Sequence, residues 1–371
     1  MGGNKSSIFA YAAELDDWMR DRGQAFKDGS PEIERSVLFH TPLAGEESVH
    51  GSNILDISLI SGPAKARSAE LVVLAYRMWE ALSYSNIRLI ARLFREAVDL
   101  DPGNAAAFAG LSFALIVEGL WGLIHIPDAY VSAQAAMQRA LEIDSEQPEA
   151  KCAAAWLKMV STRDWEGARR GFDEAMKRQP PTIRSMIGRS ALYIAEGRLA
   201  EASDLLLKAA HEHALSASVL AWYCWSEYLA GEYANALLQI EQYRTSGRQG
   251  PIVDAVEALA YIQLEEPDAH IERIEALAAD SPRNEALQGA LGYVYGVSGQ
   301  GQRARELLDA ITYLGKRSKT REPYAAALVL IGLNEKQEAV QWLEQSYRDG
   351  SFWSFGFRSD PMLAPLRDDP Y

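Results

Sequence analysis

Apolar residues recur along most of the chain at helical spacing, and the same pattern returns every 34 residues. One column of this repeat is apolar at every step: Phe172, Leu206, Ile240, Ile274, Leu308 and Trp342. A second column holds a small residue at Ala168, Ala202, Ala236 and Ala304. Between the columns the pattern predicts a helix, a short turn and a second helix, each helix about 14 residues long. Self-similarity at a fixed period of about 20 to 50 residues indicates a stacked array of such units.

Within this frame the stretch ALGYVYGVSGQGQRARELL resembles the tetratricopeptide repeat, a pair of antiparallel helices with Gly, Tyr and Ala at set positions. The matching residues are, in order, Leu291, Gly292, Tyr295, Gly299, Ala304 and Leu308. The resemblance implies an all-α, right-handed solenoid of about eight helix pairs over residues 67–349, preceded by a small strand-helix segment. In such an array each unit is expected to contact only its neighbours.

The second unit differs from the others because it carries an insertion of about eleven residues around LWGLIHIPDA. The apolar stretch before and within this insertion, residues 105–126, approaches the length of a membrane span. Glu118, Gly119 and Gly122 interrupt it. We therefore interpret it as the buried first helix of a repeat, and we expect no membrane association.

The first helices of tetratricopeptide units form a concave wall, so the resemblance also nominates a binding groove. Its candidate residues are Leu157, Arg184, Ile187, Trp222, Trp225, Tyr228 and Tyr293. A groove lined with aromatic side chains suits an amphipathic helix or an extended apolar peptide. The alternative is that these side chains only pack one repeat against the next.

Charge and chemistry narrow the function. The net charge of −14 argues against a broad nucleic-acid surface. Cys152 and Cys224 lie within apolar helical runs and are expected to be reduced core thiols, as in a cytoplasmic protein. His211 and His213 stand about 200° apart on a helix, so they do not suggest a shared metal. The sequence contains no HExxH, GxSxG or CxxC motif, and we expect no catalytic residue, metal or cofactor.

The two ends of the chain carry a second, closer resemblance. Two stretches are similar to repeat arrays that follow regulator, cyclase or kinase modules in bacteria. One is the Asp164–Trp165 pair, and the other is the tail at residues 350–371, which reads SFWSFGFRSDPMLAPLRDDPY after Gly350. SSIFAYAAELDDWMRDRG, within residues 1–23, resembles the last wing strand and closing helix of an excisionase-like or MerR-like winged helix-turn-helix domain. Its apolar stripe is Leu15, Trp18 and Met19, our candidates for an N-terminal interface.

The helices that would read DNA lie before Met1 in this comparison, so we expect no specific DNA binding by this chain alone. The alternative for residues 1–23 is a helix that packs on the solenoid or on another chain. Residues 24–66 read as a linker in which two strand-like runs, Val37 to His40 and Ile54 to Ile60, could pair as a short hairpin.

These observations favour a non-enzymatic interaction or effector-sensing module of a bacterial cytoplasmic, transcriptional regulator. It would bind a protein segment, a peptide or a small ligand in its concave groove, and the sequence leaves a homo-oligomer open. Two rivals remain: a pure assembly scaffold, and an enzyme whose helices close as a toroid around an acidic pocket.

Overall fold

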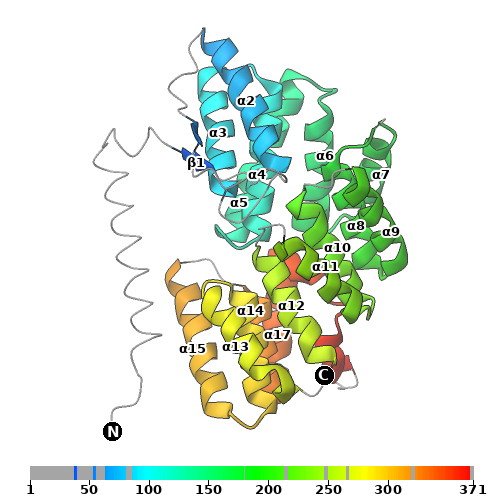
Figure 1. Ribbon diagram of the computed structural model, residues 1–371. Helices are drawn as coiled ribbons and strands as arrows, with labels where there is room; N and C mark the ends of the chain where they lie inside the picture. The colour runs from blue at the N-terminus through cyan, green and yellow to red at the C-terminus, as the bar shows by residue number, and fades with distance from the viewer. Residues whose placement is uncertain are drawn as a thin grey trace, which may run out of the picture. The chain divides into compact units, whose positions relative to one another are not determined.

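The computed structural model describes residues 37–39, 53–55, 63–80, 86–178, 180–212, 216–245, 250–264, 267–318 and 322–367 (Figure 1). The chain divides into two compact units, residues 1–63 and 64–371. In the first unit β1 (Val37–Phe39) pairs antiparallel with β2 (Asn53–Leu55), with Leu38 opposite Ile54. The strand-helix segment expected within residues 1–23, with Leu15, Trp18 and Met19, lies outside the described residues.

The second unit contains consecutive helix pairs, as the 34-residue period predicts. The pairs are α2 (Ala64–Glu80) with α3 (Ile87–Leu100), α4 (Ala105–Leu120) with α5 (Ile126–Ile143), α6 (Pro148–Leu157) with α7 (Trp165–Met176), α8 (Ile183–Glu196) with α9 (Leu199–Glu212), α10 (Ala217–Leu229) with α11 (Tyr233–Thr245), α12 (Pro251–Leu264) with α13 (Ile271–Asp280), α14 (Glu285–Val297) with α15 (Gly301–Ser318), and α16 (Pro323–Gly332) with α17 (Lys336–Asp349). The prediction of an all-α array of about eight pairs is confirmed.

Local chemistry sets where these helices begin and turn. Six first helices start after a polar cap whose side chain accepts a hydrogen bond from a backbone N–H of the first turn: Asn104, Gln147, Thr182, Ser216, Asn284 and Glu322. Four turns between paired helices hold a glycine with a positive φ, at Gly122, Gly197, Gly231 and Gly299. The last three are separated by multiples of 34 residues, so the repeating glycine column reflects a left-handed turn position.

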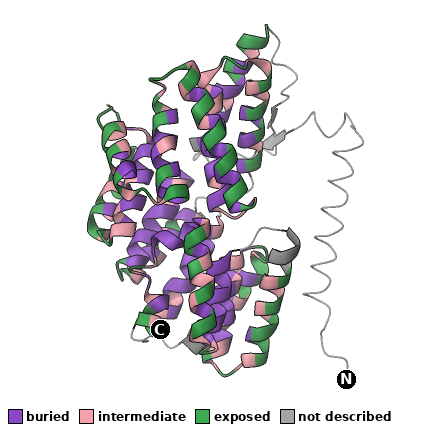
Figure 2. Cartoon of the chain, turned by 180° about the vertical axis from the view of Figure 1, so that it is seen from behind, coloured by how far each residue is buried: buried purple, intermediate pink, exposed green. Residues whose placement is uncertain are grey.

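The first helices form an inner layer and the second helices an outer one (Figure 2). All ten residues of α16 and nearly all of α10 are buried, whereas α17 buries only Ala339 and Ser346. Successive first helices also pack on one another. A Cβ on Gly296 of α14 would lie 2.4 Å from the carbonyl carbon of Gly332 in α16, so these two helices touch through their backbones.

The chain after α17 does not continue the array but runs over the inner layer. It forms two short 3₁₀ helices, η4 (Phe352–Phe355) and η5 (Pro361–Leu363), and a last turn, α18 (Ala364–Arg367). We call residues 350–371, described as far as Arg367, the C-terminal tail. The Tyr130 hydroxyl of α5 donates a hydrogen bond of 2.7 Å to the Gly350 carbonyl oxygen.

The expectation that each unit contacts only its neighbours is wrong. The Arg184 guanidinium of the fourth pair lies 4.8 Å from the Tyr76 ring centroid of the first, and the Trp156 ring of the third pair lies 6.1 Å from the Trp222 ring of the fifth. The tail adds contacts to the second to sixth pairs and to the eighth. In the described residues no helix is long and apolar enough to cross a membrane. The apolar stretch that resembles a span is α4, which is buried on most of its surface.

Candidate functional site

The aromatic residues predicted to line the groove do lie on the inner layer, but the C-terminal tail covers them. Trp222, Trp225 and Tyr228 of α10 are only 6%, 1% and 0% exposed. The ring of Phe352 packs against both tryptophans, with centroids 4.8 Å from Trp222 and 4.5 Å from Trp225. A Cβ on Gly356 would lie 2.7 Å from the Trp225 ring, so the tail backbone presses directly on it.

A buried carboxylate anchors the second half of the tail. Asp360 accepts hydrogen bonds from the hydroxyls of Tyr228 (2.9 Å) and Tyr324 (2.6 Å), and from the Met362 backbone N–H (3.0 Å). Burial raises the pKa of Asp360, and the hydrogen bonds from both tyrosines partly offset this rise. Arg367 donates to the Asp360 backbone carbonyl oxygen (2.7 Å). The tail is thus held by polar contacts as well as by its aromatic rings.

The other groove candidates lie on α6, α8 and α14. Arg184 donates to both carboxylate oxygens of Glu149 at 2.7 and 2.9 Å, and its guanidinium lies 4.8 Å from the Tyr76 ring centroid. Leu157 and Ile187 are buried. Tyr293, on α14, is partly exposed, and its backbone lies against Gly332. The seven residues do not form one open surface.

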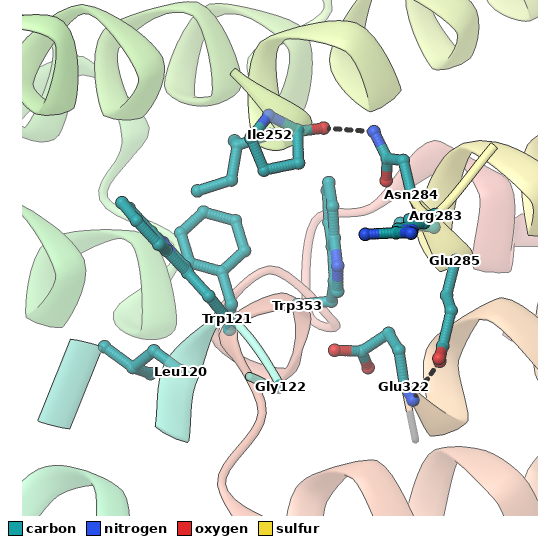
Figure 3. A pocket seen from close by; sticks show the side chains of 12 residues that line it. Leu120, Trp121, Gly122, Ile252, Arg283, Asn284, Glu285, Glu322 and Trp353 are labelled. Carbon is teal, nitrogen blue, oxygen red and sulfur yellow. Dashed lines mark hydrogen bonds between the residues drawn. The ribbon is translucent and has the colours of Figure 1, made fainter. Parts of the chain in front are cut away.

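An open pocket remains beside the tail on the inner layer (Figure 3). It is formed by the turn after α4, the starts of α12, α14 and α16, and η4 of the tail. Its lining residues are Leu120, Trp121, Gly122, Pro251, Ile252, Arg283, Asn284, Glu285, Ala286, Glu322, Phe352 and Trp353. The cavity measures about 70 Å³, several times the roughly 10–15 Å³ that one water needs.

Two carboxyl groups dominate the electrostatics of this pocket. Glu285 lies in the first turn of α14 and accepts a 2.6 Å hydrogen bond from the backbone N–H of Glu322, the N-cap residue of α16. Burial raises the pKa of Glu285 to about 7. Burial, and then repulsion from Glu285, raises the pKa of Glu322 to about 8. Near neutral pH this pair therefore holds less than its full negative charge.

The sequence did not point to this pocket. Glu322 precedes Pro323 and is recognisable only as the start of a helix, and Glu285 only as an acidic first-turn residue. Trp121 lies in the insertion that marks the second unit as unusual, and this insertion was the one available signal. Its residues extend α4 and α5 to 16 and 18 residues, so that their turn reaches the pocket.

Other candidate chemistry was also located in the structure. Among the described residues no group of three or more His, Cys, Asp or Glu side chains is arranged to hold a metal. His211 lies in the last turn of α9, and His213 lies outside the described residues. Cys152 and Cys224 are buried and free, and burial raises the pKa of both thiols. They are therefore core side chains and poor nucleophiles.

Comparison with known proteins supports the fold. No family model matches the chain, and no curated protein matches it. Among solved structures, the APC/C hetero-tetramer Cut9-Hcn1 is similar with a TM-score of 0.53 at 14% identity, over 84% of this chain and 57% of that one.

Two further solved structures have lower TM-scores. Yeast Tom70 has a TM-score of 0.42 at 14% sequence identity, and the match covers 99% of this chain and 79% of Tom70. A tetratricopeptide repeat protein from Parabacteroides merdae has a TM-score of 0.42 at 14% sequence identity, and the match covers 61% of this chain and 83% of that protein. At these identities the likeness concerns architecture only. Together with the 34-residue period, the Cut9-Hcn1 match supports a solenoid of tetratricopeptide type.

Proposed function

We propose that this chain is a non-enzymatic interaction module that receives a small ligand, or one side chain of a protein partner, in the open pocket of its inner layer. One observation carries the proposal. The tail covers the aromatic wall, yet the tail and four helix ends from distant repeats still leave a lined cavity between them. Solenoids of helix pairs commonly bind partners on such inner surfaces.

The tail determines the size of the occupant. The buried side chains of Phe352, Trp353 and Phe355 each contribute about 1.5–3 kcal/mol of hydrophobic stabilisation, so displacing them together would cost several kcal/mol. The pocket is also smaller than the roughly 300–1,000 Å³ of sites that hold drug-sized molecules. A whole amphipathic helix, the occupant first expected, is therefore less suited to this face than a single head group.

The resemblance of the array and tail to bacterial regulators supports a finer proposal, that the module senses an effector in the cytoplasm. A ligand in the pocket would touch α12, α14, α16, the turn after α4 and the tail together. Binding would stabilise the curvature of the array that holds these helices and the tail at the distances they have around the ligand. A partner module attached to the array would then change position with ligand occupancy.

The rival enzyme is a helical toroid around an acidic pocket, and hydrolysis of a glycoside in such a pocket, for example, needs two carboxyl groups that flank the substrate. Here Glu285 and Glu322 are linked through a backbone N–H and lie on the same wall (Figure 3). This arrangement favours binding over acid-base chemistry on a substrate held between them. A pure scaffold predicts that the pocket has no ligand, which the following experiment tests.

The test is a selection of short peptides and a metabolite panel on the immobilised full chain, followed by affinity measurements with variants. Trp121→Ala opens one wall of the pocket, and Tyr313→Ala removes an aromatic side chain that is 56% exposed on α15. We expect selected ligands to bind Trp121→Ala at least tenfold more weakly and Tyr313→Ala unchanged. Ligands that bind both variants as well as the parent chain would overturn the proposal.

A further inference from the structure

We infer that a groove on the outer layer, between α7 and α9, is a docking site for an extended peptide segment with an apolar side chain next to a basic one. This groove shares no lining residue with the pocket beside the tail, so it is a second surface that the proposed function does not use. Two features support the inference. A largely buried guanidinium group lacks a hydrogen-bond acceptor, and exposed carboxylates surround an apolar floor.

The groove lies where three consecutive helices pack together. α8 packs against both α7 and α9 (Figure 1). Met176 of α7, Leu205 of α9, and Arg189 and Tyr193 of α8 contribute to its lining. The groove measures about 460 Å³, which is within the roughly 300–1,000 Å³ of sites that hold drug-sized molecules. It is therefore large enough for a few residues of a peptide.

Arg189 is held firmly in this groove, yet its hydrogen-bond donors are unused. Its side chain is 13% exposed, and its Nε atom lies 3.2 Å from Oδ1 of Asp173. Its guanidinium carbon lies 4.4 Å from the ring centroid of Tyr193. A guanidinium group carries five N–H donors. In the described part of the chain none of the five donates a hydrogen bond, and the Nη1 atom is buried without a partner.

Arg184, on the same helix, provides a direct comparison. Its side chain is also 13% exposed, but it donates two hydrogen bonds to Glu149, at 2.7 and 2.9 Å. Nearly all buried polar groups in folded proteins have a hydrogen-bond partner, so the unused donors of Arg189 require an explanation. Because this guanidinium lines an open groove, the acceptor can come from a ligand. A peptide backbone offers a carbonyl oxygen at every residue.

The apolar part of the groove accounts for the apolar side chain of the peptide. Met176 and Leu205 are both half-buried, and they face the groove from two different helices. An aliphatic or aromatic side chain placed against them would remove apolar surface from water on both partners. The unbranched Met176 side chain adapts readily to the shape of such an occupant.

The exposed charges of the groove favour a basic peptide over an acidic one. Among the lining residues, Asp173, Glu201 and Asp204 supply three exposed carboxylates, whereas Lys208 supplies one exposed ammonium group. Asp173 and Glu201 already form ion pairs with arginines of this chain. Asp204 forms no ion pair with any other residue that the structure describes. Asp204 is therefore available to a lysine or arginine of the peptide.

Other classes of partner suit the groove less well. A nucleic acid, with one phosphate per nucleotide, would meet the three carboxylates. A small anion would be attracted by Arg189 and Lys208 but repelled by the same carboxylates. A peptide satisfies the guanidinium through a carbonyl oxygen that carries no net charge, and its basic side chain pairs with Asp204.

The test is a selection of random dodecapeptides displayed on phage against the immobilised full chain, with dissociation constants of the synthetic peptides measured by fluorescence anisotropy. We expect the selected peptides to share an apolar residue next to lysine or arginine. Arg189→Met keeps an apolar stem but removes the donors, and it should weaken binding at least tenfold, because a hydrogen bond to a charged group is lost. Asp204→Asn removes an exposed charge and should weaken binding roughly two- to fivefold.

Matched changes on α3 serve as controls. Arg92→Met and Asp99→Asn, both at exposed positions, should leave the affinity unchanged. Trp121→Ala should also leave it unchanged, because Trp121 lines only the pocket beside the tail. A peptide that depends on Arg189 is assigned to the groove and set aside from the test of the pocket. Peptides that depend on Trp121 and not on Arg189 would support the proposed function and contradict the outer groove.

Several results would overturn the inference. They are a selection without any binder that depends on Arg189, or selected peptides that share acidic residues. Water alone would then satisfy the donors of Arg189. Far-UV circular dichroism checks that Arg189→Met is folded. If it is not, Asp204→Asn and the salt dependence of the parent chain decide: the affinity should fall between about 50 and about 500 mM NaCl, and no change in either experiment would contradict the inference.

Discussion

Phe352→Ala tests whether the C-terminal tail is part of the hydrophobic core. Phe352 is buried, and its ring contacts three tryptophans, with centroids 4.5 Å from Trp225, 4.8 Å from Trp222 and 5.1 Å from Trp353. Truncating a buried phenylalanine to alanine costs about 3–5 kcal/mol, because the removed ring leaves a cavity. Whole domains are stable by only about 5–15 kcal/mol, so the expected loss is large.

The assay is urea unfolding of the full chain followed by far-UV circular dichroism. Tyr313→Ala removes an aromatic ring of similar size from an exposed position and should change the free energy of unfolding by less than about 0.5 kcal/mol. A loss below about 1 kcal/mol for Phe352→Ala, with an unchanged slope against urea, would refute the packing of the tail on the inner layer. It would return Trp222 and Trp225 to the surface available to a partner.

Three further predictions follow from other contacts. Gly296→Ala should lower the free energy of unfolding by about 1–3 kcal/mol, because the new Cβ forces α14 and α16 apart. Gly301→Ala, where a Cβ would make only ordinary contact, should leave this free energy nearly unchanged, and chemical unfolding compares the two variants. Arg184→Ala breaks a nearly buried ion pair and should cost about 3–5 kcal/mol. Lys177→Ala breaks an exposed ion pair and should change the free energy of unfolding far less, and equal losses for the two variants would contradict the assigned burial. The pKa of Glu322 in the folded chain is raised to about 8, so its stabilising contribution is complete below pH 4.5 and is lost as the pH rises through 8. The melting temperature should therefore fall over this pH range, and it should fall less in Glu322→Gln. A melting temperature that does not change with pH in either chain would contradict the raised pKa.

The sequence predicted what depends on local spacing. The 34-residue period located the helix pairs, and the glycine column at Gly197, Gly231 and Gly299 located turns that need a positive φ, because both features act within a few residues of the chain. The resemblance also placed Trp222 and Trp225 correctly on the first helix of their unit. A pattern of apolar residues could not say whether a partner or the chain itself covers these side chains, since apolar side chains are buried in both kinds of contact.

The pocket depends on contacts between residues far apart in the sequence. Glu285 and Glu322 meet only because α14 and α16 pack closely, and Trp353 reaches them only because the tail turns back over the inner layer. Neither contact has a local signature. The predicted N-terminal interface of Leu15, Trp18 and Met19 lies outside the described residues and stays a prediction.

The central claim is that the ligand enters the pocket beside the tail and leaves the covered aromatic wall undisturbed. Fluorine NMR of the full chain labelled with 5-fluorotryptophan tests it directly, with each resonance assigned by a Trp→Phe variant. On addition of a ligand from the peptide and metabolite selection, the account predicts that the resonances of Trp121 and Trp353 shift while those of Trp222 and Trp225 stay in place. Shifts confined to Trp222 and Trp225, or no shift at Trp121 and Trp353 at saturating ligand, would contradict it.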